Sequence, residues 1–118
     1  MSVEQTIEKF FEIFNSRDLQ EMGNLLSPEA EFYFPKTRPL IGRDRILKFL
    51  KLLFRQYPEL SFTVVRVVCQ ENQAAVHWTN RGINRRSEPY ENEGATILEI
   101  REGRISYISD FFKDTEKW

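Results

Sequence analysis

Apolar residues recur at helical spacing in three stretches of the first half of the chain. Two of them begin with capping signals, Ser2 followed by Gln5 and Asp18 followed by Glu21, in which a side chain satisfies a free backbone N–H of the first turn. The third stretch ends before Pro58, because proline lacks the N–H that a continuing helix needs. The pattern therefore predicts three helices, at about residues 2–16, 18–27 and 43–57.

The second half of the chain alternates apolar and polar residues with a period of two, which is typical of β-strands. Four strands joined by short turns are predicted, at residues 62–69, 74–83, 90–101 and 104–112. A shorter aromatic strand, Glu31–Phe34, is stopped by Pro35, and residues 35–42 are predicted to form a loop. Helices followed by an antiparallel meander indicate an α+β fold, in which three N-terminal helices cover one face of a curved, mainly antiparallel sheet.

Size, charge and cysteine content narrow the class of protein. The chain of 118 residues and 14.1 kDa suffices for a single domain, residues 1–118. Its 17 basic and 18 acidic residues nearly cancel, so no dominant field would attract nucleic acid or an anionic membrane surface. The single cysteine, Cys69, and the single histidine, His77, can form neither an internal disulfide nor a four-ligand zinc site. With no signal peptide, no apolar run of ~20 residues and no phosphate-binding glycine loop, we expect a soluble cytoplasmic protein without metal or cofactor.

Asp110 is the best candidate for chemistry. It lies between Ile108 and Phe112 at strand spacing, so the face that buries those two side chains would also draw the Asp110 carboxyl out of water. Burial penalises the charged form of a carboxyl and raises its pKa, which suits acid/base catalysis. The alternative is an ordinary aspartate at a strand end, which faces water or caps the following turn.

The strand at residues 74–83 supplies a second polar candidate. Alternation puts Val76, Trp78 and Asn80 on one face, and the large Trp78 belongs inside. The Asn80 amide is then carried inward and needs a hydrogen-bond partner, because an unpaired buried amide costs ~1 to 3 kcal/mol. Asp110 or a ligand could supply that partner, or the amide is satisfied within a closed core.

The opposite face of the sheet has no predicted cover, because three helices on one side leave it open. Alternation places five residues there: Val65, Val67, His77, Thr79 and Tyr107. We therefore expect the chain to form a homodimer through this face.

The order of these elements and four local motifs resembles the nuclear-transport-factor-2-like (NTF2-like) superfamily, in its SnoaL-like polyketide cyclase branch. The motifs are Trp78 on the second strand of the meander, Pro89-Tyr90 followed by Gly94, the turn at Gly103-Arg104-Ile105, and the final Asp110-Phe111-Phe112. The resemblance covers nearly the whole chain and implies a cystatin-like cone, in which the sheet wraps around the helices.

Related enzymes of this fold differ from the chain at their catalytic positions. The ketosteroid isomerases carry a tyrosine on the first helix and a general-base aspartate at the end of the first strand. The positions of this chain that resemble these two hold Phe10 and Phe34 instead. The limonene-epoxide-hydrolase type carries an arginine and an aspartate at the positions of Trp78 and Asn80, and only its last-strand aspartate, matching Asp110, is retained. The cyclase-like members are more similar, since they are thought to use one last-strand aspartate without metal or cofactor.

The resemblance implies a small-molecule pocket protein, a cofactor-independent cyclase, isomerase or dehydratase. Its apolar pocket in the cone is predicted to be lined by Tyr33, Phe54, Trp78, Ile108 and Phe112. Asp110 would move a proton of a small apolar or aromatic ligand, while Asn80 and the Trp78 indole orient the oxygen of that ligand. Two alternatives remain: a non-catalytic dimeric ligand-binding module, and an interaction module whose core is filled by side chains.

Overall fold

The computed structural model describes residues 1–117, which form three helices and six strands. The helices are α1 (Val3–Ser16), α2 (Leu19–Leu25) and α3 (Arg43–Gln56). The strands are β1 (Leu26–Tyr33), β2 (Leu40–Ile41), β3 (Glu59–Gln70), β4 (Gln73–Ile83), β5 (Pro89–Arg101) and β6 (Arg104–Phe112). None of the three helices in this range has the length and apolar character that a membrane crossing would demand.

The predicted capping residues begin the first two helices. The Ser2 hydroxyl accepts a hydrogen bond from the Gln5 backbone N–H at 3.1 Å, and the Gln5 side chain accepts one from the Ser2 N–H at 2.9 Å. Asp18 accepts from the Glu21 N–H at 3.1 Å in the same way at α2. These contacts satisfy N–H groups that the first turn of a helix leaves free, and they confirm the predicted helix starts.

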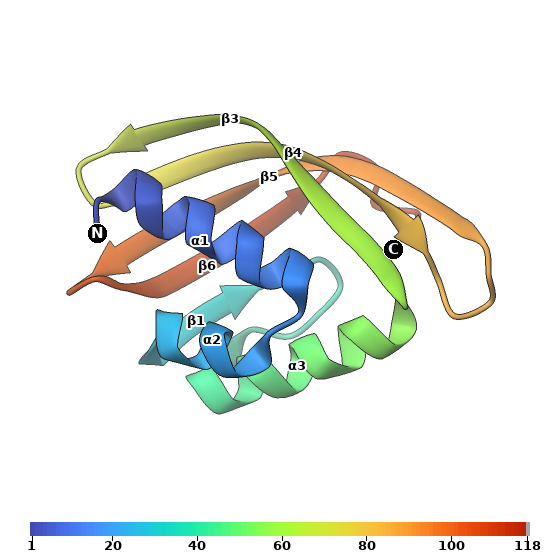
Figure 1. The fold of residues 1–118 in the computed structure, drawn as a ribbon, viewed down its shortest axis with the longest axis horizontal. Helices are drawn as coiled ribbons and strands as arrows, with labels where there is room; N and C mark the ends of the chain where they lie inside the picture. The colour runs from blue at the N-terminus through green and yellow to red at the C-terminus, as the bar shows by residue number, and fades with distance from the viewer. Residues whose placement is uncertain (118) are drawn as a thin grey trace.

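The sheet has the strand order β2-β1-β6-β5-β4-β3. Strands β3 to β6 pair antiparallel in sequence order, which confirms the predicted meander, and β1 joins it by parallel pairing with β6. The helices lie on the concave side of the curved sheet (Figure 1). The fold is α+β, as predicted.

The prediction for the first strand was wrong in its start. Strand β1 begins at Leu26 and includes Pro28, which the sequence pattern indicated as a break, and β2 lies within the predicted loop. The pairing of β1 with β6 shifts register between Leu26 and Glu31, and this irregularity accommodates a proline that cannot donate to a ladder.

The concave side of the sheet, which we call the inner face, holds the hydrophobic core. Helix α1 buries Ile7, Phe10 and Phe14 against it, and the Phe14 ring lies 4.8 Å from the Phe62 ring of β3. Burying an apolar side chain of this size contributes roughly 1.5 to 3 kcal/mol, so the aromatic contacts fix the helices on the sheet.

The convex side, which we call the outer face, is open to solvent. Val68 is 62% exposed and Phe111 is 58% exposed. A bulge between Val64 and Arg66 changes the phase of β3, so that Val67 pairs with the inward Val76 and Val68 takes a place on the outer face. The predicted placement of Val67 on the outer face is therefore wrong.

Candidate active site

Asp110 lies on the inner face of β6, near the end of the strand. Ile108 and Phe112, at two residues on either side, are buried, whereas the neighbouring Phe111 points outward. Asp110 keeps partial exposure, but the protein atoms that crowd its carboxyl raise the pKa to about 7, and a hydrogen bond from Thr96 opposes this rise. Near neutral pH the group therefore holds both its acid and its base form.

Two buried side chains connect Asp110 to the centre of the sheet. The Thr96 hydroxyl on β5 donates to Asp110 Oδ1 at 2.5 Å, and the Trp78 indole Nε1–H on β4 donates to Thr96 Oγ1 at 2.8 Å. Thr96 and Asp110 are direct partners in the antiparallel register, while Trp78 pairs with Gly94. The Trp78 indole N–H thus already donates to Thr96 and is not free to orient a substrate oxygen.

Aromatic rings fill the inner face beside these polar groups. The Phe112 ring lies 5.3 Å from the Trp78 ring and 5.3 Å from the Phe34 ring, between centroids, and Phe62 lies 4.7 Å from Trp78. Trp78 and Ile108 are fully buried. The structure therefore brings Trp78, Ile108, Phe112 and Asp110 together, within a packed aromatic cluster.

The structure does not bring Tyr33 and Phe54 to this cluster. Tyr33 lies on the outer face, since the flanking Phe32 points inward, and its hydroxyl donates to Glu31 at 2.7 Å. Its ring packs at 5.3 Å from that of Tyr107. The Phe54 ring contacts helix α1 instead, at 5.3 Å from the Phe14 ring.

Asn80 is buried but is separated from Asp110. It pairs with Asn92 on β5, four residues from Thr96, which corresponds to roughly 13 Å along the strand. The Asn80 amide forms a hydrogen bond with the Tyr90 hydroxyl, which also accepts one from Asn92 Nδ2 at 3.2 Å. Burial raises the pKa of Tyr90 to about 12. The Oδ1 atom of Asn80, a residue 4% exposed, has no hydrogen-bond partner among the described residues. Asn80 therefore belongs to a second polar cluster and does not share a floor with Asp110.

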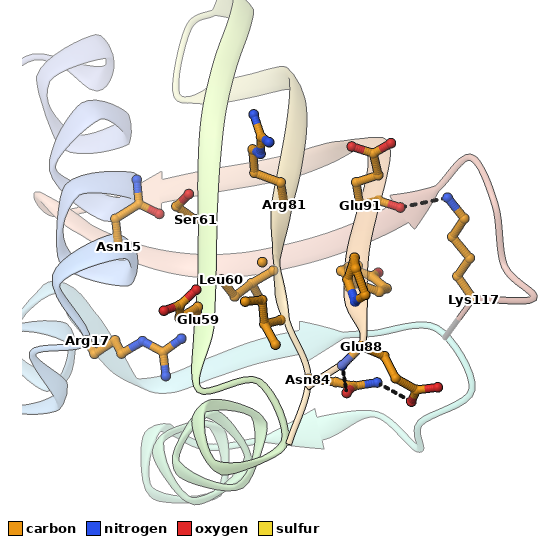
Figure 2. Close-up of a pocket in the computed structure, with 14 residues that line it drawn as sticks. Asn15, Arg17, Glu59, Leu60, Ser61, Arg81, Asn84, Glu88, Glu91 and Lys117 are labelled. Atoms are coloured by element: carbon orange, nitrogen blue, oxygen red, sulfur yellow. Dashed lines mark hydrogen bonds between the residues drawn. The ribbon is translucent and has the colours of Figure 1, made fainter. Parts of the chain in front are cut away.

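A surface groove of about 1070 Å³ lies near this second cluster, at the ends of β3, β4 and β5 (Figure 2). Charges of both signs line it: Arg17, Arg81 and Lys117 among Glu59, Glu88 and Glu91. The Lys117 ammonium donates to the Glu91 carbonyl at 2.8 Å, and Asn84 donates to Glu88 at 3.0 Å (Figure 2). None of the residues predicted from the sequence for the site lines this groove.

Metal coordination has no candidate within residues 1–117, where no group of three histidine, cysteine or acidic side chains is placed to hold an ion. His77 lies on the outer face and its Nε2 contacts Glu93 at 2.6 Å, which lowers the pKa of that carboxyl. At the candidate site on the inner face, the ionisable side chain is the carboxyl of Asp110.

Thr96 is the residue of the candidate site that sequence reasoning missed. It lies two residues beyond Gly94 on a predicted strand, and the inward placement of Trp78 could have indicated it, once the hairpin register was known. Gly94 makes the arrangement possible, because a Cβ there would lie 2.8 Å from the Trp78 ring and would collide with the Phe111 carbonyl.

Solved structures share this fold across nearly their whole length. An NTF2-like protein of unknown function from Burkholderia pseudomallei superposes with a TM-score of 0.90 at 20% identity, covering 99% of this chain and 95% of that one. IdmH of Streptomyces antibioticus, a proposed polyketide cyclase, superposes with a TM-score of 0.85 at 22% identity, covering 96% of this chain and 93% of IdmH. A proposed SnoaL-like polyketide cyclase from Jannaschia gives 0.84 at 15% identity, covering 94% and 85%.

Sequence comparison places the chain in a family. No curated protein matches it. The family model of the SnoaL-like domain matches residues 7–108, so that Asp110 lies just beyond the matched segment. Since this match spans most of the chain and agrees with the shared fold, the protein belongs to the SnoaL-like domain family.

Proposed function

We propose that the protein is a small-molecule acid/base catalyst of the SnoaL-like type, which uses Asp110 without a cofactor. The observation that carries the proposal is the pKa of about 7 of this inward carboxyl, set among aromatic rings and held by Thr96. A catalytic acid or base is most effective when its pKa lies near the working pH. The apolar side chains beside Asp110, among them Phe112 and Ile108, favour an apolar or aromatic ligand.

The proposed reaction is proton transfer at a carbon next to a carbonyl group. Ionised Asp110 removes a proton from that carbon, and the resulting carboxylic acid returns it to another atom of the same molecule. Protons and electrons balance over the cycle, so no oxidant or reductant is consumed. Cyclisation, isomerisation and dehydration can each begin with this step.

Hydrogen–deuterium exchange tests the proposal without knowledge of the natural substrate. The probes are acetophenone and β-tetralone in heavy water, with loss of the proton signals next to the carbonyl followed by NMR. We expect the protein to accelerate exchange over buffer and Asp110→Asn to reduce that acceleration at least about 100-fold, because an amide cannot accept the proton.

The control variant for this experiment is Asp44→Asn, which makes the same change at an exposed position in the first turn of α3. It should exchange the probes as fast as the wild type. Equal acceleration by wild type and folded Asp110→Asn would refute the catalytic role of Asp110.

A non-catalytic dimeric binding module is the second candidate, and the outer face supports it. Val65, Val68 and Phe111 expose apolar surface there, and the His77–Ala95–Phe111 row crosses three neighbouring strands. An exposed apolar face of this kind is typical of a protein–protein contact. The proposed partner is a second copy of the chain, packed face to face.

Light scattering at micromolar concentration should give a mass of twice 14.1 kDa. Phe111→Glu places a charge in the proposed contact and should reduce the mass to that of one chain. Leu52→Glu is the matched control, because Leu52 is 57% exposed on α3, on the helical side of the molecule. A monomeric wild type, or a Phe111→Glu protein that stays dimeric, would contradict the proposed interface.

A further inference from the structure

When Asp110 is ionised, the hydrogen bonds of Trp78, Thr96 and Asp110 can run in only one direction, because a carboxylate accepts and cannot donate. An indole N–H donates and never accepts, so the Thr96 oxygen must be the acceptor of the 2.8 Å bond from Trp78. A threonine hydroxyl carries a single proton, and the 2.5 Å contact to Asp110 Oδ1 uses it. Thr96 and Trp78 are both buried, so water does not compete for these groups.

This direction makes the two oxygens of Asp110 unequal. Oδ1 accepts the Thr96 proton when the carboxyl is ionised, and the neutral acid keeps this hydrogen bond when its own proton lies on Oδ2. We propose that Thr96 is a positioning residue, which holds Asp110 by Oδ1 and leaves Oδ2 as the oxygen that carries and transfers the proton. The catalytic part of this inference rests on the proposed function, whereas the direction of the hydrogen bonds does not.

Among residues 1–117, no second charged side chain contributes to the pKa shift of Asp110. The inward residues nearest to it on the flanking strands are Gly94, Thr96 and Leu98 on β5 and Phe32 on β1. The buried residues of the three helices are apolar except for Thr6. Among the described residues, the buried groups with a titratable proton are the phenols of Tyr57 and Tyr90, and Tyr90 pairs with Gly82 at the far end of β5.

The Trp78 indole therefore serves as a reporter of the charge on Asp110. When Asp110 loses its proton, the Thr96 hydroxyl is polarised toward Oδ1 and its oxygen becomes a better acceptor for the indole N–H. In a nitrogen-15 NMR titration the Trp78 indole signal should shift with the same midpoint as the Asp110 carboxyl. The sequence has two tryptophans, and Trp118→Phe identifies the signal of Trp78.

Variants at Thr96 test the role of the hydroxyl. Thr96→Val keeps the shape and should abolish the titration of the indole signal, while the pKa of Asp110 becomes higher because the carboxylate loses a donor. Thr96→Ser keeps the hydroxyl and should retain both properties. A wild-type indole signal that does not follow Asp110, or a Thr96→Val protein in which it still does, would overturn the inference.

The exchange assay with acetophenone separates this inference from the proposed function. If the inference and the proposed function both hold, the pH profile of exchange moves to higher pH in Thr96→Val. The Thr96→Ser protein should keep the pH profile of the wild type. An indole signal that follows Asp110 in a protein without exchange activity would refute the catalytic function alone. An active Thr96→Val protein with an unmoved pH profile would refute the positioning role alone.

Discussion

Asp110→Asn is expected to raise the melting temperature of the protein by on the order of 10 °C at about pH 8 and to change it little at about pH 4. Burial raises the pKa of Asp110 from 3.8 to about 7 in the folded protein. At about 1.4 kcal/mol per pKa unit, this rise lowers the free energy of unfolding by up to about 4 kcal/mol once the carboxyl is ionised. The amide has no proton to lose, so the variant avoids the loss.

The sign follows from which state binds the proton. Between about pH 4 and pH 7 the folded protein keeps the Asp110 proton while the unfolded chain has released it, so the free energy of unfolding falls as the pH rises. Below this window both states are protonated, and above it both are ionised. Above about pH 7 the free energy of unfolding of the wild type is therefore lowered by the full amount. In that range Asp110→Asn should be most stabilised relative to the wild type.

Thermal unfolding of both proteins between about pH 4 and pH 8 measures this difference. Asp44→Asn is again the control and should leave the profile of the wild type unchanged, since Asp44 is exposed. A folded Asp110→Asn protein that is less stable than the wild type at about pH 8 would instead identify Asp110 as a structural residue that needs its charge.

Gly94→Ala is expected to destabilise the protein by about 3 kcal/mol or more. The added methyl group would lie 2.8 Å from the Trp78 ring and closer still to the Phe111 carbonyl of the paired strand. Both neighbours are held, Trp78 by full burial and Phe111 by its pairing with Ala95, so β5 and β6 must separate. Chemical denaturation measures the loss.

Gly23→Ala supplies the comparison for this variant. It makes the same change in helix α2, where the new Cβ would meet only the end of the flexible Leu47 side chain, at 3.3 Å. Alanine also favours the helix over glycine, so this variant should be as stable as the wild type or slightly more stable. Similar losses for both variants would contradict the close approach of β6 and Trp78 at Gly94.

The features that sequence predicted well depend on neighbours along the chain. The caps at Ser2 and Asp18 join residues three positions apart, and the strand period alone places Asp110 beside Ile108 and Phe112. The same period could have placed Tyr33 on the outer face, once Phe32 and Phe34 were assigned inward.

The features that sequence did not predict depend on pairing between distant strands. Alternation gives the face of Asn80 but not its level along the sheet, and the register places it four residues from the Asp110 level. The hydrogen bonds of Thr96 to Trp78 and Asp110 likewise exist only because β5 pairs with both β4 and β6. Pro28 ends a helical pattern locally, but the partner strand β6 decides that a strand begins before it.

A carbon-13 NMR titration of the Asp110 side-chain carboxyl tests the central claim most directly, because the proposed chemistry requires a carboxyl that is half ionised near neutral pH. Asp110→Asn identifies the signal by its disappearance. We predict a midpoint of about 7 for this signal. A midpoint at the ordinary value of 3.8 would contradict the account, since the carboxyl would then be a solvated aspartate at a strand end.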